Sequence, residues 1–167
     1  MRRLTAPLLV FAYGNPSRGD DALGPQLLDL LADQRLRHPE WPELELLTDF
    51  QLQVEHAVDL ENRELILFID ASISCPAPCV LSRLQAARDI RYTTHEMSPE
   101  AVLHVFEKIF HRPAPPAFML AVRGESFNLG EPLTPEALDN RDAALALLVQ
   151  LCDQPHTKAW QSLISHA

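Results

Sequence analysis

Three short apolar runs constrain the fold more than any other feature of the sequence. They are PLLVFAY at 7–13, LILFIDAS at 65–72 and AFMLAVRG at 117–124. A run of this length without polar alternation is typical of a strand that is buried on both faces. Between the runs lie segments whose leucines recur at helical spacing. Strands that alternate with helices predict an α/β fold, a three-layer sandwich with a mostly parallel twisted central sheet flanked by helices.

Weaker patterns predict the remaining elements. Two helix starts are marked by Ser98-Pro99-Glu100 and Thr134-Pro135-Glu136. In each, a hydroxyl stands at the N-cap, proline at the first helical position and an acid in the first turn. The expected helices are 22–36, 54–62, 99–110 and 135–152, and the other expected strands are 44–50 and an edge strand at 80–85.

Length and composition predict one domain. The chain has 167 residues, of which 47% are apolar and 22% charged, as in ordinary globular domains. We expect a single protease-like α/β domain at 1–153. Residues 154–167 are expected to form a polar tail, with a weak amphipathic stretch around Trp160.

Charge and cysteine content indicate the environment. A net charge of −9 without a basic run argues against binding to nucleic acid or anionic membranes. No apolar stretch approaches the roughly 20 residues that span a bilayer. The first apolar run leads into Gly14 without a small-residue cleavage site, so we interpret it as a strand and not as a signal peptide. Three cysteines, an odd number, favour a reducing compartment, and we expect a cytoplasmic protein.

Polar residues next to the predicted strand ends are the candidate functional residues, because ligands of open α/β sheets bind at the carboxyl ends of strands. Asp20 and Asp21 follow the first strand, Asp70 ends a central strand, and His95 precedes the helix at 99–110. A carboxylate at the end of a buried strand must face a crevice or be paired, because its uncompensated burial is costly. Two carboxylates and one imidazole from three loops can bind a divalent transition metal and leave positions open.

The acidic pair also has simpler interpretations. Carboxylates are favoured in a first helical turn, so Asp20 or Asp21 can serve only the start of a helix. The spacing of Gly14 and Gly19 after a strand approaches that of a phosphate-binding loop. We reject that interpretation, because the two aspartates stand where such a loop needs a lysine and a hydroxyl and would repel a polyphosphate.

The sequence GNPSRGDDALG at 14–24, together with Asp70 and His95, resembles the hydrogenase maturation endopeptidases. These proteases remove the C-terminal extension of the large subunit of [NiFe] hydrogenases. The resemblance covers residues 8–151, approximately. At 49–57 the sequence DFQLQVEHA replaces the GGT turn of many members, and its QLQ-E pattern is similar to members that serve NAD-linked cytoplasmic hydrogenases.

The resemblance implies a monomeric peptide hydrolase that recognises nickel already inserted into the precursor. The metal-contacting positions of the family fall on Asp21, Asp70 and His95, which makes Asp20 the structural member of the pair. Asp21 and Asp70 are then also the expected catalytic residues. Hydrolysis would use a water that is polarised by the metal or activated by a carboxylate. The substrate carries the nickel, so the protease binds the ion transiently.

Two other functions are open at this point. A phosphoacceptor receiver domain also has an acidic pair, a central aspartate and a threonine at sheet-strand ends, which Asp20, Asp21, Asp70 and Thr94 would imitate. Against it, the acidic pair lies several residues past the strand, and Arg123 stands where a lysine is expected. The third function is a metal-dependent chaperone that binds the hydrogenase subunit without cutting it.

Overall fold

The computed structural model describes residues 5–88 and 97–164, and the expected metal ligand His95 lies outside these residues. Five strands form one sheet in the order β2-β1-β3-β5-β4. Strands β2, β1, β3 and β5 are mutually parallel, and β4 is antiparallel to β5. The strands are β1 (Leu8–Tyr13), β2 (Leu44–Asp49), β3 (Leu65–Ser72), β4 (Cys79–Arg83) and β5 (Ala117–Arg123). The predicted α/β fold with a mostly parallel sheet is confirmed.

The central strands are apolar without alternation because helices cover both faces of the sheet. In β1, Leu8 and Val10 point into one apolar cluster, and Leu9 and Phe11 point into the other. The same alternation holds along β3, where the side chains of residues 65–69 are all buried. Each strand thus contributes to two cores at once, which explains the unbroken hydrophobic runs.

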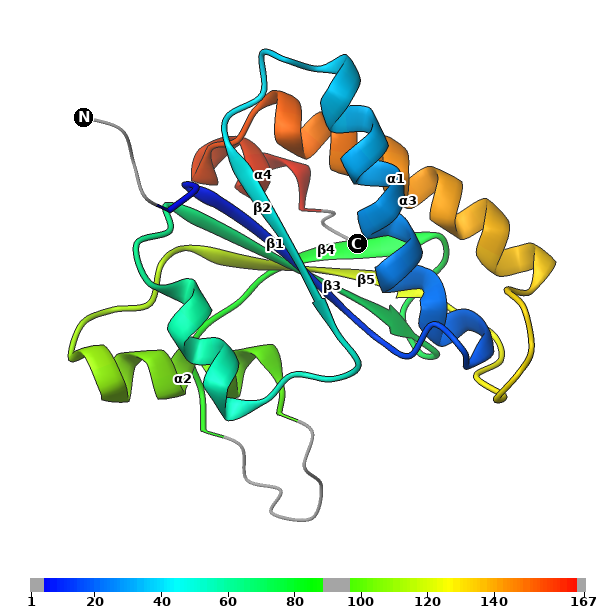
Figure 1. The fold of residues 1–167 in the computed structure, drawn as a ribbon, viewed down its shortest axis with the longest axis horizontal. Helices are drawn as coiled ribbons and strands as arrows, with labels where there is room; N and C mark the ends of the chain where they lie inside the picture. Colours follow the sequence, from blue (N-terminus) through cyan, green and yellow to red (C-terminus); the bar gives the residue numbers. More distant parts are fainter. Residues whose placement is uncertain (1–4, 89–96, 165–167) are drawn as a thin grey trace.

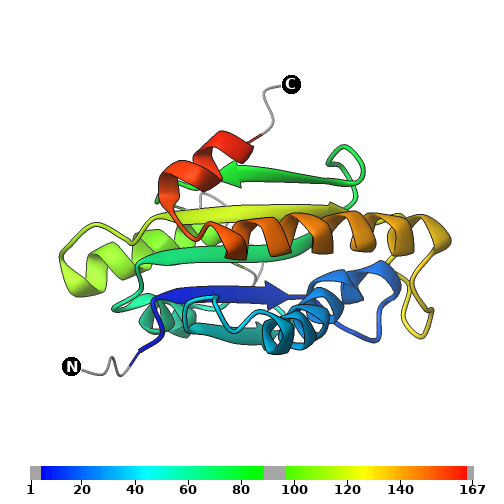
Figure 2. The same cartoon turned by 90° about the horizontal axis from the view of Figure 1, so that it is seen from above.

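Helices form the two outer layers. One face of the sheet carries α1 (Leu23–Arg37), α3 (Pro135–Asp153) and α4 (Thr157–Leu163), and the other carries η2, a 3-10 helix (Val54–Leu60), and α2 (Pro99–Phe110). Figure 1 shows the sheet between the two helical layers, with α1, α3 and α4 above it and α2 below it, and Figure 2 shows the molecule from above. None of the described helices combines the length and the apolarity that a membrane span requires.

Both predicted helix starts are confirmed. The Ser98 hydroxyl accepts a hydrogen bond from the backbone N–H of Ala101 at 3.1 Å, and the Thr134 hydroxyl accepts one from Ala137 at 3.2 Å. A proline follows each cap. The first N–H groups of a helix have no partner within the helix, so the N–H that proline lacks is not needed there. These caps place the first turns of α2 and α3 at the carboxyl edge of the sheet.

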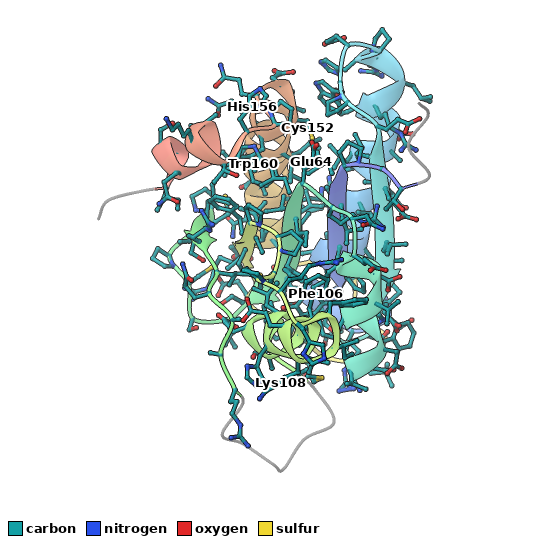
Figure 3. All side chains as sticks on the ribbon, turned by 90° about the vertical axis from the view of Figure 1, so that its left-hand side faces the viewer. Glu64, Phe106, Lys108, Cys152, His156 and Trp160 are labelled. Atoms are coloured by element: carbon teal, nitrogen blue, oxygen red, sulfur yellow. The ribbon has the colours of Figure 1, made fainter. Side chains whose placement is uncertain are left out.

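The C-terminal segment differs from the predicted polar tail. Residues 157–163 form α4, and its Trp160 is fully buried in the core on the α1 and α3 side. The Trp160 ring meets Phe118 edge-on with centroids 5.3 Å apart, and its indole N–H donates to the carbonyl of Leu151 at 2.8 Å. Figure 3 shows Trp160 on one side of the sheet and Phe106 of α2 on the other. Residues 157–163 are therefore part of the domain.

We predict that replacing Trp160 destabilises the whole domain. Trp160→Ala removes a large buried ring and should lower the free energy of unfolding by about 3–5 kcal/mol in urea denaturation. Trp160→Phe is the control, because it keeps an aromatic ring and loses the indole hydrogen bond and a smaller volume, so its loss of stability should be clearly smaller. A loss below about 0.5 kcal/mol for Trp160→Ala, the size of an ordinary surface substitution, would contradict the packing described.

Candidate functional site

A cleft of about 960 Å³ lies at the carboxyl edge of the sheet. Its walls come from the loops after β1, β2 and β3, from β4, from the start of α2 and from the loop after β5. Both expected carboxylates, Asp21 and Asp70, line it. The apolar part of the lining includes Tyr13, Phe50, Ile73, Met97, Met119 and Phe127. The cleft thus combines three acidic residues, Asp21, Asp70 and Glu100, with an apolar surface.

The structure brings Asp21 and Asp70 into one cleft from separate parts of the chain. Asp70 belongs to β3, beside Ala121 of β5, and Asp21 belongs to η1, the 3-10 turn Gly19–Ala22 that precedes α1. In residues 5–88 and 97–164, these two carboxylates are not part of a compact cluster of three metal-ligating side chains. The third expected ligand, His95, is outside the described residues, so the complete metal set stays a prediction.

The loop after β1 folds back so that Asp21 closes it. The backbone N–H of Asn15 donates to one carboxylate oxygen of Asp21 at 2.7 Å. Gly14 makes this possible, because its φ is +145° and a Cβ atom there would lie 2.2 Å from the backbone oxygen of Asp21. Only glycine fits such a conformation at such a contact. The orientation of Asp21 toward the cleft therefore depends on Gly14.

Gly24 sets how closely α1 approaches the strands. A Cβ atom at this position would lie 2.8 Å from the carbonyl oxygen of Tyr13 and 3.3 Å from that of Ile69. The first turn of α1 thus rests directly on the ends of β1 and β3. This contact holds η1, which precedes α1, at the carboxyl edge of the sheet.

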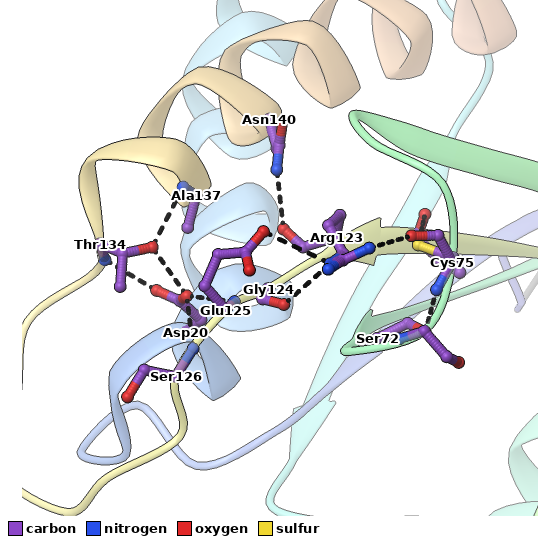
Figure 4. Close-up of polar contacts among 12 residues, drawn as sticks. Asp20, Ser72, Cys75, Arg123, Gly124, Glu125, Ser126, Thr134, Ala137 and Asn140 are labelled. Carbon is purple, nitrogen blue, oxygen red and sulfur yellow. Dashed lines mark hydrogen bonds and ion pairs between the residues drawn. The ribbon is translucent and has the colours of Figure 1, made fainter.

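Asp20 has a different environment from that of its neighbour. Its side chain is fully buried and accepts four hydrogen bonds, from the backbone N–H groups of Glu125, Ser126 and Thr134 and from the Thr134 hydroxyl, at 2.7–3.1 Å. Figure 4 shows these contacts. Asp20 is therefore the structural member of the pair, as predicted. It does not cap α1, whose start has no side-chain cap, but holds a loop more than 100 residues away.

The hydrogen bonds determine how Asp20 titrates. Burial acts to raise the pKa of Asp20, but the bonds from Glu125, Thr134 and Ser126 together outweigh it and hold the pKa below its ordinary value of 3.8. A carboxyl group whose pKa is lower in the folded chain stabilises the fold above its unfolded pKa. That stabilisation is lost as the pH falls through the lower folded value.

Further backbone contacts join the acidic turn to the loop after β5. The N–H of Asp20 donates to Ser126 O at 2.8 Å, Gly19 N–H to Glu131 O at 3.1 Å, and Gly130 N–H to Ser17 O at 2.7 Å. These bonds fasten residues 17–20 to residues 126–131. These contacts hold η1, the turn that contains Asp21, against the loop after β5.

Arg123, at the end of β5, connects this loop to the one after β3. Its guanidinium donates to the carbonyl of Cys75 at 3.1 Å and pairs with Glu125 at 3.4 Å, while its own carbonyl accepts from Asn140 of α3 at 3.0 Å. Figure 4 shows Arg123 between the two loops. The residue therefore helps to position the segment that follows Asp70.

The segment after β2 contains a histidine that sequence reasoning did not single out. His56 is buried, and its Nδ1 accepts from the N–H of Gln53 at 2.8 Å, so its Nε2–H donates to Asp49 at 3.1 Å. The ring packs edge-on against Phe11 with centroids 4.7 Å apart. Both ring nitrogens are used, so His56 positions the cleft-lining residues 50–52 and is not placed to bind metal. In the sequence, only the nearby Asp49 could have indicated a partner for His56. The contact between them forms only because the chain folds back between residues 49 and 56.

Comparison with known proteins gives a result only at the level of structure. No protein-family model and no curated protein matches the chain. Among solved structures, the hydrogenase maturating endopeptidase HybD from E. coli aligns with a TM-score of 0.64 and 23% identity, over 87% of this chain and 92% of its own. This chain has the fold of that endopeptidase.

Two further solved structures of hydrogenase maturation proteases also align with this chain. The hydrogenase 2 maturation peptidase from Thaumarchaeota archaeon SCGC_AB-539-E09 has a TM-score of 0.58 and 23% identity, covering 86% of this chain and 95% of its own. The [NiFe] hydrogenase maturation protease HycI from Thermococcus kodakarensis KOD1 has a TM-score of 0.61 and 15% identity, covering 90% and 95%. The resemblance in sequence is thus confirmed as a likeness to hydrogenase maturation endopeptidases in fold.

The topology argues against a receiver domain. Receiver-type sheets have five parallel strands in the order 2-1-3-4-5, whereas here β5 lies beside β3, and β4 is an antiparallel edge strand. Asp20, one of the two acids that would bind the metal of a receiver, is buried and fully hydrogen-bonded. Thr94, the expected threonine, lies outside the described residues.

We predict that Gly14→Ala disturbs the site through Asp21. The substitution combines an unfavourable φ with a backbone clash, so it should cost more than the about 1–3 kcal/mol of backbone strain alone. Gly130→Ala is the matched control, because Gly130 also has a positive φ, +84°, but a Cβ there meets nothing within 4 Å. Chemical denaturation measures both. Equal losses for the two variants would show that the contact with Asp21 is unimportant.

We predict that Asp20→Asn destabilises the protein and Asp21→Asn does not to the same extent. Both oxygens of Asp20 accept hydrogen bonds, so the NH₂ group of an asparagine at this position would face a donor with which it cannot bond. This should lower the free energy of unfolding by about 2–4 kcal/mol. The wild type should lose stability on acidification below pH 4, approximately, whereas the variant should lose less over that range. Identical pH profiles of unfolding for wild type and Asp20→Asn would refute this role.

Proposed function

We propose that the protein is an endopeptidase that removes the C-terminal extension of a [NiFe] hydrogenase large-subunit precursor after nickel insertion. The supporting observation is that Asp21 and Asp70 line one cleft at the carboxyl edge of the sheet. The cleft belongs to a chain with the fold of hydrogenase maturation endopeptidases. Under this proposal the protein is a cytoplasmic monomer, and the precursor is its partner.

Nickel would reach the cleft as part of the substrate. Carboxylate oxygens and an imidazole suit a divalent transition metal, and Asp21, Asp70 and His95 are the residues we propose as its contacts. A site with three protein ligands leaves coordination positions to the precursor's own ligands, so the ion can leave with the product. Recognition of nickel would restrict cleavage to precursors that already contain the metal.

The two aspartates would also act in hydrolysis. One oxygen of Asp21 accepts the N–H of Asn15, which fixes the plane of the carboxylate and leaves the second oxygen for a ligand or a water. In the proposed reaction Asp21 or Asp70 takes a proton from a water as the water attacks the scissile carbonyl carbon. The peptide C–N bond then breaks, and the proton passes to the leaving amine. Nickel bound there would supply Lewis-acid polarisation.

The apolar lining fits a peptide substrate. Phe50 and Ile73 are exposed over 63% and 61% of their surface, although both are large hydrophobic residues at the cleft. Exposed apolar side chains around a cleft are typical of a surface that binds another chain. We propose that they contact the precursor on either side of the scissile bond. The segment that contains Phe50 includes the QLQ-E pattern, so it is where a preference for an NAD-linked hydrogenase would be expressed.

The proposal predicts loss of processing in single variants. Asp21→Asn and Asp70→Asn should each slow shortening of a nickel-loaded precursor by about 100-fold or more, because each removes a metal contact and a candidate base. His95→Gln should act in the same direction. The shortening is followed on a denaturing gel. Asp139→Asn, on the exposed face of α3, is the matched control and should process at the wild-type rate.

The same assay distinguishes a chaperone from a protease. If the wild type binds the precursor, as seen by co-purification, but never shortens it, the protein is a chaperone. If Asp21→Asn and Asp70→Asn both process the precursor like wild type, the assignment of the site is wrong.

A further inference from the structure

A second group of metal-ligating side chains lies at the opposite edge of the sheet from the cleft. His38 ends α1, Glu40 follows in the connection to β2, and Asp153 is the last residue of α3. Their ligand atoms all lie within 4.8 Å of one another. Since α1 and α3 both begin at the carboxyl edge of the sheet and run back along it, their ends meet at the amino edge (Figure 1). The group is therefore distinct from Asp21 and Asp70.

Neighbouring groups hold His38 in a state suited to binding a cation. Its Nδ1 lies 2.9 Å from the carbonyl oxygen of Gln34. A carbonyl only accepts, so Nδ1 carries the hydrogen, and in the neutral ring Nε2 then presents its lone pair. The ring stacks on Trp41 with centroids 4.3 Å apart and planes 7° from parallel. A backbone carbonyl that fixes the tautomer in this way is the usual partner of a metal-binding histidine.

The carboxylate of Asp153 is oriented as well. The indole N–H of Trp41 donates to its Oδ1 at 2.7 Å, which leaves Oδ2 for a ligand. Trp41 is itself buried, with 8% of its surface exposed. One tryptophan thus positions two of the three ligating side chains, although they are separated by more than 100 residues in the sequence.

The electrostatics at the end of α3 favour a cation. A helix C-terminus carries partial negative charge, so an acidic side chain there is unfavourable unless a positive charge is near. Asp153 stands at the end of α3, and the last turn of α3 has no basic residue. The last turn of α1 has Arg35 and Arg37, and Arg35 donates to the carbonyl of Leu44 at 2.9 Å. A cation between His38 and Asp153 would therefore offset the charge at the end of α3, which has no basic residue of its own.

We propose that His38, Glu40 and Asp153 form a binding site for a divalent transition ion such as Zn²⁺, which ties the end of α1 to the end of α3. One nitrogen and two carboxylate oxygens are a ligand set that such ions accept, with a fourth position left to water. Ligand atoms of a tetrahedral zinc ion lie about 3.4 Å apart, so side-chain shifts of about 1 Å would close the site. Glu40 is exposed and free to make such a shift.

The test is a titration of the purified protein with ZnCl₂, followed by tryptophan fluorescence and isothermal calorimetry. Trp41 contacts two of the ligating residues, whereas Trp160 is in the core, so a change in emission reports on this site. The Asp21→Asn/Asp70→Asn double variant separates it from the cleft. We expect one zinc ion to bind to that double variant with the wild-type fluorescence change, and Zn²⁺ to raise its Tm.

His38→Gln, introduced into the same double variant, should weaken zinc binding by at least about tenfold and abolish the rise in Tm. Asp153→Asn should also weaken binding, although its remaining oxygen can still accept from Trp41. His104→Gln on α2 is the matched control and should bind like its parent. Circular dichroism confirms that each variant is folded. The proposal is overturned if zinc binding disappears in the cleft variant, or if His38→Gln and Asp153→Asn both bind zinc as their parent does.

Discussion

The buried carboxylate of Asp20 is the interaction on which the arrangement of the cleft depends. A charged group without access to water is tolerated only if donors surround it, and the loop after β5 supplies three N–H groups and a hydroxyl. Because Asp20 is held from the far side of the turn, Asp21 must face the other way, toward the cleft. Adjacent residues of the same type therefore have opposite roles, one in folding and one at the surface that we propose acts on substrate.

Much of the fold could be predicted because its signals are local. The runs of β1, β3 and β5 are apolar without alternation, and the caps at Ser98 and Thr134 fix two helix starts. The exceptions depend on tertiary contacts. The antiparallel direction of β4 follows from its short connection to β3, and the burial of Trp160 requires Phe118 and Leu151 as partners. The weak amphipathic stretch around Trp160 does not by itself indicate which part of the core the tryptophan packs against.

The candidate site could be predicted in part. The rule that ligands bind at the carboxyl ends of strands was enough to bring Asp21 and Asp70 together, because it depends on topology and not on side-chain detail. The partners of Asp20 lie 105–114 residues away, and no spacing in the sequence indicates them. The same holds for His56, whose role is visible only once its two nitrogens are seen to bond Gln53 and Asp49. Positioning residues are thus harder to predict than the groups they position.

The polarity of the helices makes the two edges of the sheet electrostatically different. The first turns of α1, α2 and α3 lie at the carboxyl edge, where their N-terminal dipole ends favour negative charge. Carboxylates at the cleft are therefore favoured even without a cation, which suits the transient binding of a substrate's metal that we propose. At the amino edge the helix C-termini add to the charge of Glu40 and Asp153. In the proposed second site, Glu40 and Asp153 would therefore need a cation that is held permanently. One α/β layer arrangement would then support an exchangeable site at the carboxyl edge and a structural site at the amino edge.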